Sequence, residues 1–300
     1  MHIGFLNNQL DRRGTGNAIY NYAHYNEEIL GNKSTIYTFA NGRHDPAAHE
    51  RFKSRFKVKY VADGFSDLDA LYHIKSGIND GFSPGPPYLV HSVFDNEPHG
   101  TVYATVSPWM SERFKLPFVP HIVELFQTDD DLRAELGIPE DATVFGRHGG
   151  IDSFDISIWH TIYEFVVSNP RVYFVFLSTA QPHNFNHERV IFLPSTVDPY
   201  EKRRFINTCN AFIHASRLGE TFGIAVGEFA IAGKPIITHS GAPGNHLYEL
   251  GTSAYLYNNK ETLLSAFNSL TANTVVSYAY QQYTPEKVMI KFEQVFLSGL

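Results

Sequence analysis

The chain has 300 residues, of which 43% are hydrophobic and 18% are charged, and its formal net charge is −7. This composition is typical of a globular protein with one large domain or two ordinary ones, and a net acidic chain lacks the basic surface that nucleic-acid binding requires. Its single cysteine, Cys209, excludes an internal disulfide framework and fits a reducing, cytoplasmic compartment. We expect no transmembrane segment, since no apolar run is long enough, and no metal, since the histidines lack ligand spacing.

The first 120 residues read as alternating strands and helices. Strands are predicted at residues 3–6, 35–39, 88–93 and 103–106, and a helix at residues 17–30. The loop between the first strand and helix carries Gly14 and Gly16 after Arg12 and Arg13. Such a loop can bring backbone amides to an anion, although two glycines also fit an ordinary turn.

A basic stretch at residues 51–59 has two interpretations. As one strand it would carry a basic face that could contact an anionic acceptor or a membrane surface. As a helix followed by a strand it would be a solvated edge, which is the interpretation we favour.

The second half opens after a proline-rich crossing at residues 116–123, which we interpret as a domain linker. A short acidic helix is predicted at residues 129–136, and a strand at 143–147 leads into Gly149 and a helix at 154–167. Arg147 at the tip of that strand can pair with phosphate oxygens, or it can form a surface salt bridge. Cys209 is predicted to be a small core residue.

Buried strands at residues 172–177 and 190–193 and a glycine loop at 240–245 continue this pattern. Ligands collect at the carboxyl ends of parallel strands, so the loops after these strands should face a nucleotide. A last helix after Pro285 has an apolar stripe formed by Val288, Phe292 and Phe296.

The most informative stretch runs from the strand around Phe212 to the strand that opens at Ile236. Between them lies an apolar helix, predicted at residues 222–232, with Glu220 before it and Glu228 inside it. From residue 222 to residue 228 the helix rises roughly 9 Å, the scale of a sugar diphosphate. The helix N-terminus suits phosphate, and a carboxylate on each side can accept hydrogen bonds from sugar hydroxyls. An incidental acid in a buried helix is the alternative, but it would be costly without a partner.

The sequence Glu220-Thr-Phe222-Gly223-Ile-Ala-Val-Gly-Glu228, followed by Gly-Lys-Pro235, resembles the donor signature of the group 1 retaining glycosyltransferases. The resemblance implies an α/β protein of GT-B fold, with two Rossmann-like domains facing a central cleft and a short N-terminal domain. Residues 1–120 would form the acceptor-side domain and residues 121–280 the nucleotide-sugar domain. Residues 281–300 would form a terminal helix that crosses back to the first domain.

The resemblance also implies roles for individual residues. Glu228 would bind the ribose and Glu220 the donor sugar, while a histidine of the first domain, His91 or His99, would contact the transferred sugar; either could instead be structural. The family has a lysine where this chain has Asp152, so Arg217 or the first-domain arginines would have to replace it. The other residues expected at the donor are Gly14, Gly16, Arg147, Gly149, Phe222, Gly223 and Ile224.

The implied reaction moves a sugar from a UDP- or GDP-sugar to a hydroxyl of a glycan, lipid-linked or small-molecule acceptor. Retention of configuration is expected through a same-face mechanism, without a metal or separate cofactor, in the cytoplasm or peripherally at a membrane surface. Two alternatives stay open: a nucleotide-sugar epimerase, and a degenerate sugar-nucleotide-binding or structural module. A pyridine-nucleotide dehydrogenase is less favoured, because the first glycine loop lacks its third glycine.

Overall fold

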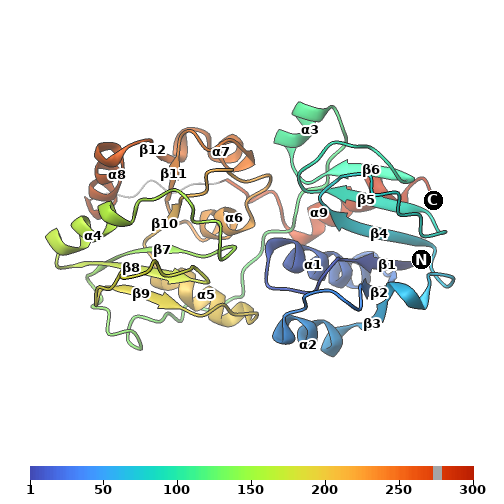
Figure 1. The fold of residues 1–300 in the computed structure, drawn as a ribbon, viewed down its shortest axis with the longest axis horizontal. Coiled ribbons are helices and arrows are strands. Elements are labelled where there is room, and N and C mark those ends of the chain that lie inside the picture. The colour runs from blue at the N-terminus through green and yellow to red at the C-terminus, as the bar shows by residue number, and fades with distance from the viewer. Residues whose placement is uncertain (273–278) are drawn as a thin grey trace. The chain divides into compact units, whose positions relative to one another are not determined.

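The computed structural model describes residues 1–272 and 279–300. It divides into two compact units, the first made of Met1–Ile122 with Gln282–Leu300 and the second of Val123–Gln281 (Figure 1). Each unit contains one six-stranded parallel sheet with helices. The predicted architecture of two Rossmann-like α/β units is therefore present.

The sheet of the first unit has the strand order β3-β2-β1-β4-β5-β6, which is a Rossmann order. All of its neighbouring strands are parallel. The sequence analysis did not predict β4, although every residue of that strand is buried. The strands are β1 His2–Leu6, β2 Lys33–Thr38, β3 Lys57–Tyr60, β4 Ala70–Lys75, β5 Tyr88–Ser92 and β6 Val102–Thr105.

The helices of the first unit come from both ends of the chain. The terminal helix α9 packs on this unit, where the Phe292 ring lies 5.3 Å from the ring of Tyr22 in α1 and 6.3 Å from that of Phe5 in β1. The apolar stripe predicted after Pro285 is therefore buried here. The helical elements are α1 Gly14–Glu28, α2 Pro46–Arg55, η1 Val61–Asp63, α3 Pro108–Phe114, α9 Pro285–Phe292 and η3 Glu293–Leu297.

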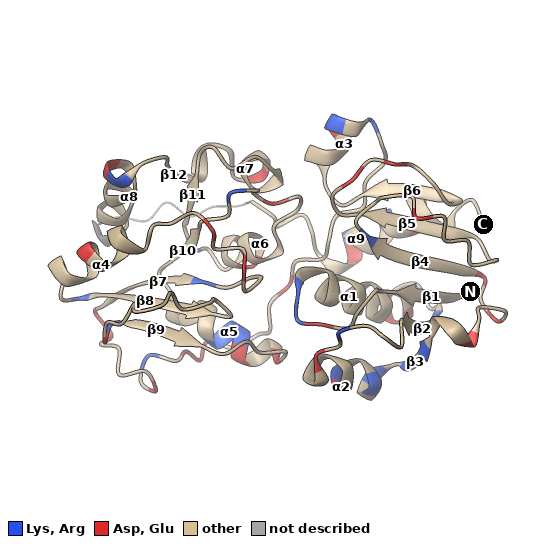
Figure 2. Cartoon of the chain, in the orientation of Figure 1, with Lys and Arg blue, Asp and Glu red and all other residues tan. Residues whose placement is uncertain are grey.

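The basic stretch of the first unit forms the end of α2 and then β3, so the helix-then-strand interpretation is confirmed (Figure 2). Its charges have local partners. Arg55 forms an ion pair with Glu27, and the Arg51 guanidinium lies 3.9 Å from the centre of the Tyr20 ring. Such a surface carries less uncompensated charge than the sequence alone suggests.

The second unit repeats the same plan with the strand order β12-β11-β10-β7-β8-β9. Its strands are β7 Thr143–Arg147, β8 Val172–Leu177, β9 Val190–Leu193, β10 Ala211–His214, β11 Ile236–His239 and β12 Tyr255–Tyr257. Its helices are α4 Trp159–Ser168, α5 Pro199–Thr208, α6 Ile224–Ile231, α7 Asn245–Leu250, η2 Gly251–Ser253 and α8 Lys260–Ala272.

Two predicted helices of the second unit differ from the structure. In place of the helix predicted at residues 129–136, residues 133–137 form a turn, and the Leu132 amide before it donates to Thr208 Oγ1 at 2.8 Å. The helix predicted from residue 154 begins only at Trp159. The backbone amides of Asp155 and Ile156 both donate to the Ala215 carbonyl, which keeps this segment extended beside β10.

The core of the second unit is aromatic. Phe145 of β7 stacks on Phe174 of β8 at 5.3 Å and contacts Phe267 of α8 at 4.9 Å. Cys209 is buried against Gly146 of β7, and burial raises the pKa of its thiol to about 12. The prediction that Cys209 is a core residue is confirmed.

Candidate functional site

The turn before α6 determines how the start of this helix is presented. Gly223 has φ of 88°, a left-handed conformation that suits glycine, and it forms the N-cap without any side-chain cap. The first amides of a helix have no partner within the helix. Because no side chain caps them here, the N-terminus of α6 is suited to an anion.

Phe222 holds the turn before α6 in place. It is buried, and its carbonyl accepts hydrogen bonds from Tyr280 Oη at 2.8 Å and Asn245 Nδ2 at 3.1 Å. The Phe222 ring packs edge-on against the Tyr280 ring at 5.6 Å. This predicted donor-binding residue therefore supports the loop with its side chain, and only its backbone borders the helix N-terminus.

The backbone of Glu220 is held by the loop before α7. The Asn245 amide donates to the Glu220 carbonyl at 2.8 Å, and a β-carbon on Gly244 would come within 2.2 Å of the same oxygen. Only glycine permits this close approach. The Glu220 side chain is 32% exposed, and its Oε1 lies 3.2 Å from His214 Nε2.

Glu228 lies one turn inside α6 and is 4% exposed. Lys202 of α5 forms an ion pair with Oε1, and His148 Nε2 lies 3.0 Å from Oε2. Burial opposes ionisation of Glu228, but Lys202 and His148 outweigh it and lower the pKa of the carboxyl to about 2. Burial lowers the pKa of His148, so this ring is neutral beside the carboxylate.

Arg147 ends β7 and is 3% exposed. Its guanidinium donates to neutral acceptors in two loops, the carbonyl of Gly150 at 2.7 Å and the hydroxyls of Ser153 and Thr179, both at 2.6 Å. Burial lowers its pKa to about 10, although Glu220 and Asp152 offset part of that effect. A buried cation attracts an anion more strongly than an exposed one does.

The other predicted donor-binding residues of the second unit, Gly149 and Arg217, lie close in sequence to Arg147 and Glu220. Gly149 has φ of 150°, and a β-carbon there would lie 3.2 Å from Arg147 Nη2. Arg217 is exposed, and its backbone amide donates to Asp155 Oδ1 at 2.6 Å. Its guanidinium Nη2 lies 3.4 Å from the Asp155 carbonyl oxygen. The structure thus brings Arg147, Gly149, Gly223 and both glutamates into one unit, with Arg217 three residues before Glu220.

The glycine candidates of the first unit lie at the start of α1. Gly14 is the first residue of that helix, and a β-carbon on Gly16 would come within 2.3 Å of the Asp11 carbonyl oxygen. Arg12 forms an ion pair with Asp45 at 2.9 Å. The close approach to Asp11 therefore explains a glycine at position 16 by packing within the first unit. A role of this loop in binding the donor across a cleft stays a prediction.

His91 is fully buried in the first unit. Its Nε2 donates to the carbonyls of Val119 at 2.9 Å and Thr105 at 3.1 Å, so Nδ1 accepts from Tyr72 Oη at 2.6 Å. Burial lowers the pKa of His91 to about 4. Both ring nitrogens thus have partners inside the protein, which is the arrangement of a structural histidine.

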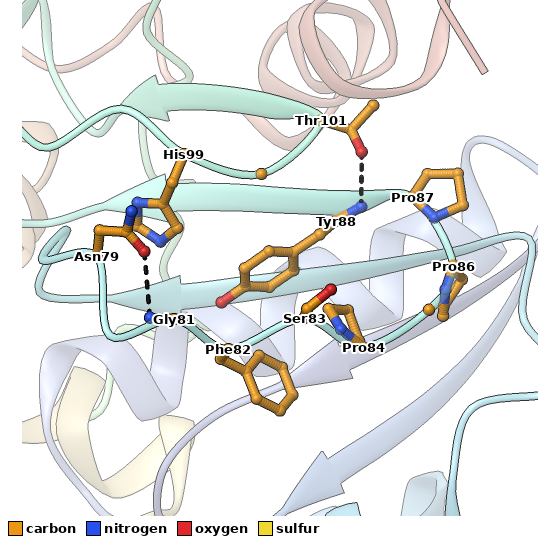
Figure 3. A pocket seen from close by; sticks show the side chains of 12 residues that line it. Asn79, Gly81, Phe82, Ser83, Pro84, Pro86, Pro87, Tyr88, His99 and Thr101 are labelled. Carbon is orange, nitrogen blue, oxygen red and sulfur yellow. Dashed lines mark hydrogen bonds between the residues drawn. The ribbon is translucent and has the colours of Figure 1, made fainter.

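His99 lies in a loop and lines a pocket of about 520 Å³ between residues 79–87 and 99–101 (Figure 3). Its Nδ1 donates to the Glu97 carbonyl at 2.6 Å, which leaves Nε2 facing Lys75 Nζ at 3.5 Å. Tyr88 and Phe82 form an aromatic wall of the same pocket. Of the two predicted histidines, His99 is therefore the one that borders open space.

Several polar residues of the second unit were missed by the sequence analysis. Most of them stand at or just after the carboxyl ends of parallel strands, where ligands collect. That position is a signal that could have found them. A polar residue at the end of an apolar run marks such a position. The missed residues are His148, Lys202, His214, Thr238 and His246.

Among residues 1–272 and 279–300, no group of three or more His, Cys, Asp or Glu side chains could hold a metal ion. None of the helices in those ranges is long and apolar enough to cross a membrane.

No family model matches the chain, and no curated protein matches it. Among solved structures, HepE of Anabaena in complex with UDP and glucose is 15% identical, with a TM-score of 0.70 over 98% of this chain and 95% of that one. WaaG, a glycosyltransferase involved in lipopolysaccharide biosynthesis, is 11% identical with a TM-score of 0.66 over 98% and 99%. A candidate UDP-N-acetylglucosamine 2-epimerase of Listeria monocytogenes is 11% identical, with a TM-score of 0.61 over 98% and 96%.

These similarities define the class of fold. The chain has the GT-B fold, with two Rossmann-like units of six parallel strands each, as the resemblance implied. At this level of identity the comparisons establish the fold alone. The arrangement of the two units about a central cleft stays a prediction.

Proposed function

We propose that the chain is a glycosyltransferase that moves a sugar from a nucleotide diphosphate sugar to an acceptor hydroxyl. The observation that carries the proposal is the placement of Glu220 and Glu228 on either side of the uncapped N-terminus of α6. Glu220, the helix N-terminus that would bind an anion, and Glu228 thus follow one another along the chain within the second unit. HepE, which has the same fold, was solved with UDP-glucose and with UDP and glucose.

The diphosphate would lie at the first turn of α6. The amides after Gly223 supply neutral donors and the helix dipole adds partial positive charge. Arg147 adds a buried cation from β7. Together these groups would stabilise the charge that develops on the departing diphosphate, which is the largest electrostatic demand of the reaction.

The ribose would lie against Glu228. Its Oε2 lies 3.0 Å from His148 Nε2, and a carboxylate oxygen can accept a second hydrogen bond, which would come from a ribose hydroxyl. The low pKa of Glu228 keeps it an acceptor at any physiological pH. Lys202 occupies Oε1, so the acid is already paired before a nucleotide arrives.

The donor sugar would meet Glu220, whose side chain is partly exposed beside the same helix. We infer retention of configuration through a same-face mechanism, in which the leaving phosphate accepts the proton of the acceptor hydroxyl. The protein would then contribute positioning and charge stabilisation and would need no metal. Assignment of the acceptor to the first unit, and of the enzyme to the cytoplasm, stays a prediction.

The proposal is tested by a thermal-shift screen against UDP- and GDP-sugars, followed by NMR of products formed with a panel of sugar acceptors in the presence of EDTA. We expect stabilisation by one nucleotide class and a product with the anomeric configuration of the donor. An inverted product would exclude the same-face mechanism. Stabilisation by no nucleotide sugar would contradict the whole proposal.

A second candidate is a binding module without turnover. Two observations favour it: Asp152 stands where the resembled family has a lysine, and the Arg147 guanidinium already donates to four groups of its own unit. Nucleotide-sugar binding without turnover against every acceptor would support this candidate. Conversion of the donor into an epimeric nucleotide sugar without any acceptor would identify an epimerase instead.

A further inference from the structure

Behind Glu220 lies a row of buried polar side chains that the proposed reaction does not yet use. His214 is the last residue of β10, Thr238 lies in β11 and His246 lies in α7. All three are buried. Burying polar groups is costly unless they hydrogen-bond to each other, so their arrangement has to be accounted for.

The row is continuous from Glu220 inward. His214 Nε2 lies 3.2 Å from Glu220 Oε1, and His214 Nδ1 lies 2.9 Å from Thr238 Oγ1. His246 Nε2 lies 3.2 Å from the same Thr238 oxygen, and the His246 ring centre lies 4.5 Å from that of His214. The backbone of His214 is also tied, since its carbonyl accepts from Tyr257 Oη at 3.1 Å.

The chemistry of the groups determines the direction of each bond. An ionised carboxylate only accepts, so a His214 ring with one proton carries it on Nε2 and donates to Glu220. Its Nδ1 is then an acceptor and takes the Thr238 hydroxyl proton. The Thr238 oxygen in turn accepts from His246 Nε2–H, and this leaves His246 Nδ1 unprotonated.

The inferred hydrogen bond from His246 to Thr238 agrees with the environment of His246. Its Nδ1 is buried and has no hydrogen-bond partner within the described residues, as expected for an unprotonated nitrogen. Burial, with a smaller effect from His214, lowers the pKa of His246 to about 2, so the ring stays neutral. The row therefore has a consistent set of proton positions when His214 carries one proton.

We propose that His214 is a positioning residue that holds Glu220 in one orientation, with Oε1 bound to His214 and Oε2 directed to a hydroxyl of the donor sugar. The inference rests on the proposed function and deepens it. Because Glu220 Oε1 accepts from His214 Nε2–H, the carboxylate is presented to the donor sugar as a pure acceptor. The donor would therefore carry a free hydroxyl at the position that meets Glu220.

Two substitutions of nearly the same size separate this role from simple packing. In His214→Gln the side-chain amide can reach the position of Nε2 and donate to Glu220. In His214→Asn the amide can reach only the position of Nδ1 and bonds to Thr238. We expect His214→Asn to lower kcat/KM for the donor about 10- to 100-fold, the effect of one hydrogen bond to a charged group. His214→Gln should recover part of that loss.

Calorimetry with UDP alone shows whether the fold and the nucleotide site survive in each variant, and we expect its Kd to change less than about twofold. The double variant His214→Asn, Glu220→Gln should be no less active than Glu220→Gln alone, since His214 acts through Glu220. If His214→Asn does not fold, Thr238→Val provides the second test, because it removes the partner of His214 Nδ1 and should lower kcat/KM several-fold while UDP still binds.

Wild-type turnover in His214→Asn, or losses that multiply in the double variant, would overturn the positioning role and leave the proposed function intact. Absence of any nucleotide-sugar turnover by the unmodified chain would instead overturn the proposed function. A series of deoxy donors extends the test. The deoxy sugar that lacks the hydroxyl facing Glu220 should lose most activity with the unmodified chain and little further activity with Glu220→Gln.

Discussion

The two units have the same strand order but use their buried polar groups differently. In the first unit, the ring nitrogens of His91 bond to Tyr72 and to two backbone carbonyls, all of them inside that unit. In the second unit, His214 bonds to Glu220, whose side chain is partly exposed beside an uncapped helix N-terminus. Buried histidines of the first unit therefore stabilise the sheet, whereas those of the second can support a ligand site.

The comparison shows that the position of a polar residue on a strand does not by itself make it functional. What matters is whether its hydrogen bonds end within the core or at a group that reaches solvent. The Tyr72, His91 and Thr105 set ends in the core. The His246, Thr238, His214 and Glu220 row ends at a carboxylate that is 32% exposed.

The largest effect should come from Glu220→Ala. Loss of the carboxylate removes a group that positions the donor sugar, so we expect turnover to fall by about 10²- to 10³-fold. Steady-state kinetics with the donor found by the screen measures this. Circular dichroism should show an unchanged fold, since the Glu220 side chain contributes little to the core. Unchanged turnover would remove Glu220 from the mechanism.

The second-largest effect should come from a substitution of Glu228. Glu228→Gln keeps the volume but removes the charge that pairs with Lys202, so we expect UDP affinity to fall about 10- to 100-fold. The matched control is Lys202→Met, which leaves the carboxylate in place. If the ribose binds Glu228, this control should affect UDP binding less than Glu228→Gln does. Wild-type UDP affinity in Glu228→Gln would contradict the ribose role.

A substitution in the first unit provides the contrast. Tyr72→Phe removes the donor to His91 Nδ1 and leaves that buried nitrogen without its partner. We expect the free energy of unfolding to fall by about 1–3 kcal/mol, the cost of one unsatisfied buried group. Chemical denaturation measures the loss, and UDP affinity should not change. A fall in UDP affinity at full stability would mean that the histidines of the first unit also serve the ligand.

The smallest effect should be a pH dependence of stability, to which buried histidines of the first unit contribute. Burial lowers the pKa of His91 to about 4 and that of His73 to about 3, from an ordinary value of 6.5. Below pH 6.5 the unfolded chain binds protons that the folded chain does not, so stability is lost as pH falls toward these lower values.

Denaturation at about pH 7.5 and about pH 5 measures this slope, since both folded-state pKa values lie below that window. In His91→Gln one titrating group is gone, so the difference in unfolding free energy between the two pH values should shrink. An unchanged difference would show that His91 is not responsible for it.

Much of the fold was predictable because it depends on local patterns. The apolar runs at β1, β8 and β10 predicted buried parallel strands, and Gly233 with Pro235 predicted the end of α6. The strand β4 was missed because Tyr72, His73 and Lys75 give it a polar appearance. Those side chains are buried only because neighbouring segments supply partners, such as Tyr88 for His73 and Asp80 for Lys75.

The amino-acid sequence by itself determined the two α/β halves, the turn at Gly223 and the spacing of Glu220 and Glu228, because these follow from residues close together in the chain. Only the tertiary structure showed which side chains hold the two acids. Lys202 reaches Glu228 from α5, Thr238 reaches His214 from β11, and His246 reaches Thr238 from α7. Hydrogen bonds between distant segments depend on how the strands and helices pack, and no local pattern encodes that.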